Sequence, residues 1–155
     1  MIRISFVLCG VSKACLVGLL LGSWSASTVF GAGRGAATSS ASVCAPDRLQ
    51  DSGAVYRICM PDQDRWNGEL VVYAHGYVDP RRPIEIPEDQ LAVGDDLTLP
   101  EFANMLGFAF ATTSYRTNGL AIREGLEDLV DLVDIFIETH GEPVYIYLVG
   151  ASEGA

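Results

Sequence analysis

The residues near position 150 have the types and the spacing of a nucleophilic serine site. Gly150, Ser152 and Gly154 form a G-x-S-x-G pattern directly after a β-rich run at 144–149. A serine on a sharp turn between a strand and a helix exposes its hydroxyl, and glycines two positions to either side avoid collisions where the chain doubles back. The pattern therefore predicts a nucleophile elbow at which an acyl-enzyme can form.

A second pattern lies some 75 residues upstream. The run 70–74 ends in His75-Gly76-Tyr77. At these positions the sequence resembles the α/β-hydrolase superfamily, in which a strand ending in His-Gly supplies half of the oxyanion hole. The resemblance covers about residues 54–155 and rests on HGY, on the SYRTNG loop at 114–119 and on GASEG at 150–154. The pair Tyr115-Arg116 is also similar to a strand-end loop of the prolyl oligopeptidase branch and related serine esterases.

The resemblance implies a role for each matching residue. Ser152 would be the nucleophile, and the backbone N–H groups of Tyr77 and Glu153 would donate to the oxyanion. Each such donor is worth about 3 kcal/mol of transition-state stabilisation. Glu153 contributes its amide in this scheme, and its carboxylate points elsewhere. Four residues support the site in the same scheme: His75, Gly76, Gly150 and Gly154.

Three side chains near the site have two interpretations each. The His75 imidazole either packs and orients the oxyanion loop or touches the substrate. The Tyr77 hydroxyl is an alternative substrate contact. Arg116 is interpreted as a structural ligand of its loop, with a substrate clamp as the alternative.

The catalytic acid and base have no matching positions. In the family the order along the chain is Ser, then Asp or Glu, then His, and nothing follows Ala155 here. His140 precedes the strand that leads to Ser152, which places it about 20 Å from the hydroxyl at 3.3 Å per strand residue. His75 is committed to the oxyanion loop. We therefore expect a fold truncated after the elbow, with this chain inactive by itself.

The leading functional hypothesis is a secreted serine hydrolase that acts on carboxylic ester bonds, with peptide bonds as a further possibility. The alternatives are a non-catalytic extracellular binding module on the same fold and an inactive fragment. The expected partner is a small-molecule ester or a peptide. No cofactor fingerprint and no Cys/His cluster with metal-ligand spacing occurs in the sequence, so neither a cofactor nor a metal is expected. The oligomeric state stays open.

The elements that must position these residues alternate between strand and helix. The apolar patterns predict strands at 54–60, 70–74, 108–113 and 144–149, and helices at 101–106 and 120–139. Residues 78–100 are rich in proline and acid and are interpreted as a surface excursion. This alternation predicts an α/β fold with a mostly parallel sheet and helices on both faces, the α/β-hydrolase fold.

The predicted helix at 120–139 has an acidic face. At about 100° per residue its acidic side chains fall within one third of the circumference. A metal or partner site is one interpretation of this row, but a solvated face of an amphipathic helix explains it better. The acidic residues are Glu124, Glu127, Asp128, Asp131, Asp134 and Glu138; the predicted core face comprises Leu126, Leu129, Val130, Val133, Phe136 and Ile137.

The N-terminal segment indicates export. Residues 1–46 contain no acid, and Arg3 and Lys13 precede an apolar run at 14–24 that small residues follow. This pattern is typical of a secretory signal peptide. The run is about half of the roughly 20 apolar residues that a membrane span needs. We expect a signal peptide at 1–27 with cleavage between 27 and 31, a flexible leader at 28–46 and the N-terminal part of the hydrolase domain at 47–155. The protein would be secreted or periplasmic, in contact with a membrane only during export.

Charge and cysteine content agree with export. The 155 residues carry 20 acidic and 10 basic side chains, and without Arg3 and Lys13 the 20 acids face 8 bases, a net charge of −12. This balance excludes a nucleic-acid partner. Cys44 and Cys59 would remain after cleavage and are predicted to form a disulfide, with two free buried thiols as the alternative. Such a bridge would stabilise the fold by about 3 kcal/mol.

Overall fold

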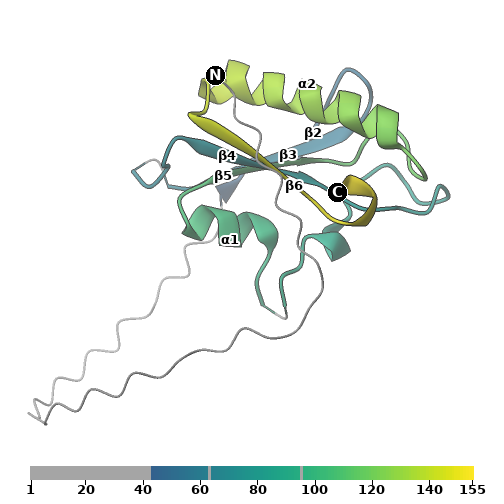
Figure 1. Ribbon diagram of the computed structural model, residues 1–155, viewed down its shortest axis with the longest axis horizontal. Helices are drawn as coiled ribbons and strands as arrows, with labels where there is room; N and C mark the ends of the chain where they lie inside the picture. Colours follow the sequence, from purple (N-terminus) through teal and green to yellow (C-terminus); the bar gives the residue numbers. More distant parts are fainter. Residues whose placement is uncertain (1–42, 63, 95) are drawn as a thin grey trace, which may run out of the picture. The chain divides into compact units, whose positions relative to one another are not determined.

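The computed structural model describes residues 43–62, 64–94 and 96–155. Within these ranges six strands form one sheet in the order β1-β3-β5-β4-β6, with β2 paired to β3 (Figure 1). The predicted signal peptide and most of the predicted leader lie outside the described ranges. The strands are β1 (Val43–Cys44), β2 (Arg48–Leu49), β3 (Val55–Met60), β4 (Glu69–Ala74), β5 (Ala109–Thr113) and β6 (Tyr145–Gly150).

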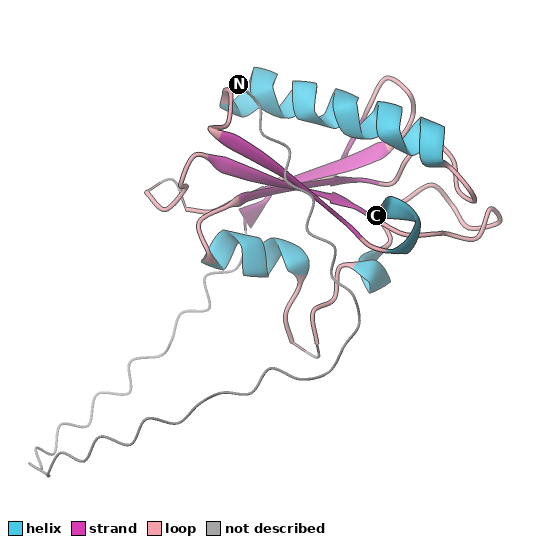
Figure 2. Ribbon diagram, in the orientation of Figure 1, coloured by secondary structure: helices cyan, strands magenta, loops and turns pink. Residues whose placement is uncertain are grey.

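The sheet is mixed. β4 is parallel to both β5 and β6, but β3 is antiparallel to β5, β1 and β2. The predicted fold class, a mostly parallel sheet with helices on both faces, is therefore wrong. Two α-helices occur in the described ranges, α1 (Leu99–Met105) and α2 (Ile122–His140), a single one against each face (Figure 2). Apolar alternation gave the positions of the strands but carries no information on their relative direction.

Successive side chains of the strands enter two separate cores. On the α2 face, Leu70 and Val72 of β4 pack with Leu132 and Phe136 of the helix. On the α1 face, Tyr73 packs with residues that include Cys59, Ala103 and Phe110. This alternation is the period of two that a strand covered on both sides requires. The helix α1 begins at a capping box in which Thr98 and Glu101 bond reciprocally.

The segment between β4 and α1 contributes to the core. It contains the short 3-10 helix η1 (Glu88–Gln90), and Ile86 and Leu91 beside it are buried in the α1-face core. The prediction of a mere surface excursion is therefore wrong at these positions. Two apolar side chains among the prolines and acids hold the segment against the sheet.

The polar and apolar faces of α2 also differ from the prediction. Asp128, assigned to the solvated row, has no exposed surface. Leu126 and Val130, assigned to the core face, are more than half exposed. Asp128 is buried because it binds the loop that follows β5. Leu126 and Val130 line a groove together with Ile146 and Leu148 of β6.

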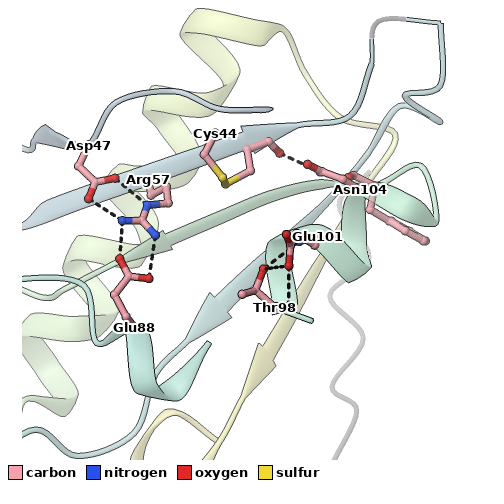
Figure 3. The surroundings of a disulfide bond; sticks show 9 residues. Cys44, Asp47, Arg57, Glu88, Thr98, Glu101 and Asn104 are labelled. Carbon is pink, nitrogen blue, oxygen red and sulfur yellow. Dashed lines mark hydrogen bonds and ion pairs between the residues drawn. A yellow bond between two sulfur atoms is a disulfide. The ribbon is translucent and has the colours of Figure 1, made fainter. Parts of the chain in front are cut away.

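The predicted disulfide is confirmed. Cys44 and Cys59 lie directly opposite each other in the β1–β3 pair and are bonded (Figure 3). Among the described residues, no helix is long and apolar enough to cross a membrane.

Candidate functional site

The G-x-S-x-G residues form the turn between β6 and the short 3-10 helix η2 (Ser152–Gly154). Ser152 is exposed and has φ 55°, a left-handed conformation that costs a non-glycine residue about 1–3 kcal/mol. A Cβ atom at Gly150 would collide with the backbone of Gly154, and one at Gly154 would collide with the backbone of Ala74. The turn thus requires both glycines and presents the serine hydroxyl at the C-terminal end of the parallel strands.

The His75-Gly76-Tyr77 loop lies against this turn. A Cβ placed on Gly76 would be 3.1 Å from Ala151 O and 3.2 Å from Ser152 Cβ. β4 and β6 are neighbouring parallel strands, so their C-terminal ends meet at one edge of the sheet. The fold therefore brings together the two segments on which the sequence-based site prediction depends.

The backbone N–H groups of Tyr77 and Glu153, the two predicted oxyanion donors, have no acceptor among the described residues. Gly76 N–H, in contrast, donates to Gln90 Oε1 (2.7 Å). Uncommitted N–H groups beside a nucleophile are the groups that can stabilise an oxyanion. The Tyr77 ring is 52 % exposed, which leaves its hydroxyl free for the alternative role in substrate contact.

His75 is buried behind the loop. Its Nδ1 donates to Gly76 O (2.6 Å), and its ring stacks on Tyr115 with 4.0 Å between centroids. Burial lowers the pKa of His75, an effect partly opposed by the backbone of Gly76 and Ser114 and by the charge of Glu153. Its Nε2 makes no hydrogen bond of good geometry within the described ranges. A 2 % exposed neutral imidazole in this position orients the loop and offers no surface to a substrate.

The Tyr115-Arg116 pair fixes the loop after β5. Tyr115 has φ 58°, and its hydroxyl donates to His75 O (3.1 Å). Burial raises the pKa of this hydroxyl, so it stays protonated and able to donate. Arg116 bonds the buried Asp128 through its backbone N–H (2.7 Å) and its guanidinium (2.7 and 3.0 Å). Arg116 is thus a structural ligand of its own loop. Its guanidinium is bonded to Asp128 of α2 and is not extended toward a substrate.

The carboxylate of Glu153 points away from the junction. Its Oε1 accepts from Ala121 N (2.7 Å), the residue that precedes α2. A mostly apolar cavity of about 190 Å³ lies between η2 and the first turns of α2, and Tyr115, Leu126 and Leu148 are among the residues that line it. Glu153 therefore connects the elbow to the helix and is not placed as a general acid.

Neither histidine of the chain is placed as a general base. His140 ends α2, and β6 then runs the length of the sheet before Ser152 is reached (Figure 1). His75 is bonded and buried as described above. Within the described ranges, no three His, Cys, Asp or Glu residues gather as metal ligands.

Two polar residues that shape the site were not singled out in the sequence. Gln90 lies in the irregular segment, and no periodicity or motif points to it. Asp128 was grouped with the solvated acids of its helix. The signal against this grouping was Arg116, a cation 12 residues earlier in the sequence.

No protein-family model matches the chain, and a search of curated proteins finds no match.

Proposed function

We propose that this chain supplies the nucleophile and the oxyanion-binding loop of an exported serine hydrolase that acts on carboxylic esters, with peptide bonds as the alternative substrate. The observation that carries the proposal is the junction at Ser152. An exposed serine in a strained left-handed turn lies beside two uncommitted N–H groups, those of Tyr77 and Glu153. Backbone strain of this kind clusters at functional sites.

The chemistry follows from this arrangement. Ser152 Oγ attacks the carbonyl carbon of the ester, and the carbonyl oxygen becomes an oxyanion that the N–H groups of Tyr77 and Glu153 stabilise. A general base takes the Ser152 proton during the attack. Collapse of the tetrahedral intermediate breaks the ester bond, the base passes the proton to the leaving alkoxide, and the alcohol departs while the acyl group stays on Ser152. Water then hydrolyses the acyl-enzyme.

The proposal also requires a base and an orienting acid. The two histidines of this chain are not placed for the first role, and the carboxylates of Glu153 and Asp128 are bonded to Ala121 and Arg116. Neither role is assigned to a residue of this chain. Export is supported by the Cys44–Cys59 disulfide, because such bonds persist in oxidising compartments.

A fluorophosphonate probe tests the nucleophile. In the full-length product of the gene, the probe should attach to Ser152, and Ser152→Ala should abolish the labelling. Ser52→Ala is a matched control, because Ser52 is also an exposed serine in a turn. Absence of labelling in folded protein, shown to be folded by its unfolding transition, would remove the proposal.

A non-catalytic binding module is the second candidate, favoured by the positions of His75 and His140. It predicts that a non-hydrolysable ester analogue binds the full-length protein, that the probe does not label it, and that Ser152→Ala leaves the affinity unchanged. Loss of affinity on that substitution together with probe labelling would instead favour the hydrolase.

A further inference from the structure

A glutamine from the irregular segment before α1 holds the peptide next to the elbow. Gln90 Oε1 accepts from Gly76 N (2.7 Å), and Gln90 Nε2 donates to Tyr77 O (3.2 Å). One side-chain amide thus binds the N–H group of Gly76 and the carbonyl group of Tyr77. A primary amide has one acceptor and two donors, so it can make both bonds at the same time.

Gln90 is itself held from several directions. Its backbone carbonyl accepts from the Tyr73 hydroxyl (3.1 Å), and its backbone N–H donates to Pro87 O (2.9 Å). Glu88, in the same short helix η1, binds Arg57 of β3 at 2.6 and 3.0 Å (Figure 3). The side chain is half-buried. The amide is therefore a fixed point against which the loop can be oriented.

These contacts decide which N–H group of the loop is left without an acceptor. The Gly76 N–H is taken by Gln90, and the Tyr77 carbonyl is taken by the same side chain. Of the polar backbone groups between Gly76 N and Tyr77 O, the Tyr77 N–H is the one left without an acceptor in the described ranges. The Tyr77 N–H shares a planar peptide unit with Gly76 O, which accepts from His75 Nδ1, and Gln90 holds the peptide units on either side of it.

We propose that Gln90 is a positioning residue, which orients the Tyr77 N–H toward the oxyanion that forms at Ser152. This inference rests on the proposed function. It extends the site to a segment in which no sequence motif marks a contribution. In this role Gln90 acts through its bonds to Gly76 N and Tyr77 O, which hold the peptide units on either side of the 76–77 peptide.

The test compares variants of Gln90 in the full-length gene product. Gln90→Leu removes both bonds at nearly the same volume. Gln90→Glu keeps an acceptor for Gly76 N–H but, as a carboxylate, cannot donate to Tyr77 O. Gln50→Leu is the matched control. Gln50 is also a hydrogen-bonded glutamine, but its amide binds Asp128 O and Asp131 and not residues 76–77.

Hydrolysis of a p-nitrophenyl ester, fluorophosphonate labelling and amide hydrogen exchange are measured on each variant. We expect Gln90→Leu to lower kcat and the labelling rate by about 10- to 100-fold, part of the 10²- to 10³-fold loss found when an oxyanion donor is removed. KM should stay within about twofold, because the oxyanion forms only in the transition state. Exchange of the Gly76 amide should accelerate. Gln90→Glu should recover part of kcat, and Gln50→Leu should lower stability without lowering kcat.

The outcomes separate this inference from the proposed function. If the unmodified protein is folded and unlabelled, the proposed function fails, and the positioning role fails with it. If it is labelled and Gln90→Leu reacts at the same rate, the nucleophile stands and the role of Gln90 is overturned. A fall in kcat equal to that of Gln50→Leu at equal loss of stability would also overturn it, because a general loosening of the fold would then explain both variants.

Discussion

At one edge of the sheet a disulfide and an ion-pair network cover β3, whereas β6 at the other edge has neither kind of contact among the described residues. Arg57 of β3 binds Asp47 on one side and Glu88 on the other, at 2.6 to 3.0 Å, and both carboxylates raise its pKa. The strands β1 and β2 lie along the same edge. This edge is closed by covalent, ionic and backbone bonds.

The β6 edge is apolar and open within the described ranges. A groove of about 300 Å³ runs between β6 and α2, and its lining of nine residues includes Val130, Ile137, Ile146 and a single charged residue, Asp134. Val144 and Tyr145 are also exposed at this edge. An edge strand with uncharged side chains is a template for pairing with a further strand. The disulfide and the ion pairs of the sheet therefore lie at the β3 side, to which Glu88 of η1 is bonded, while Ser152 follows β6 at the open edge.

The largest effect is expected from opening the closed edge covalently. Replacement of both cysteines by serine should lower the free energy of unfolding by about 3 kcal/mol, since the bond closes a loop with 14 residues between its ends. Urea unfolding of the variant and of the reduced unmodified protein measures this loss. Equal midpoints for the oxidised protein and the variant would show that the disulfide does not stabilise this edge.

Removal of the ion pairs should have a smaller effect. Arg57→Met should cost about 1 kcal/mol, because the Arg57 side chain is 18 % exposed and its two partners are open enough for water to replace it. Arg81→Met is the matched control: Arg81 pairs with Asp79 at the surface, so no measurable change is expected. Equal midpoints in urea for both variants would mean that the Arg57 network adds nothing to the closed edge.

The loop that follows β4, between the two edges, should respond to acid through His75. Because burial lowers the pKa of His75 below its ordinary value of about 6.5, the unfolded chain takes up a proton before the folded chain does. The contribution is fully present above pH 6.5 and is lost as the pH falls toward the folded pKa. Urea unfolding at pH 7.5, 6.5 and 5.5 should show this slope, and His75→Asn should flatten it. His140→Asn, which removes a more exposed imidazole, should change the slope less; the reverse ranking would contradict the assignment.

Polar substitution at the open edge should have the smallest effect on stability. Leu126→Lys and Val144→Lys replace side chains that are 59 % and 64 % exposed, so we expect the free energy of unfolding to change by less than about 0.5 kcal/mol. Any self-association should decrease, because lysine at an exposed edge opposes pairing. Light scattering measures the association. A large loss of stability would show that these residues are part of the folded core.

The sequence predicted the elements well and their relations only in part. The runs that became β4, β5 and β6 and the pattern of α2 were found because a buried strand and an amphipathic helix each have a periodicity. The direction of β3 was not, since Val55, Arg57 and Cys59 alternate in the same way in a parallel or an antiparallel pair.

The candidate site was predictable where backbone shape demands glycine. Gly150 and Gly154 are required by close contacts within the turn, and this requirement is visible as a motif. Gln90 and Asp128 were not predictable, because each is fixed by a partner that only the fold brings near: Gly76 in one instance and Arg116 in the other. The assignment of catalytic roles at Ser152, Tyr77 and Glu153 stays a prediction.

The position of the disulfide also has a mechanical meaning. Cys44 belongs to a strand of only two residues, so hydrogen bonds alone would hold the start of the described fold weakly. With the S–S bond in place, a pull on the chain before Val43 is transmitted covalently to Cys59 of β3, the six-residue strand next to β1. The short strand cannot then be peeled away by a force that separates its hydrogen bonds one after another. Separation of β1 from β3 under force would instead require reduction of the disulfide.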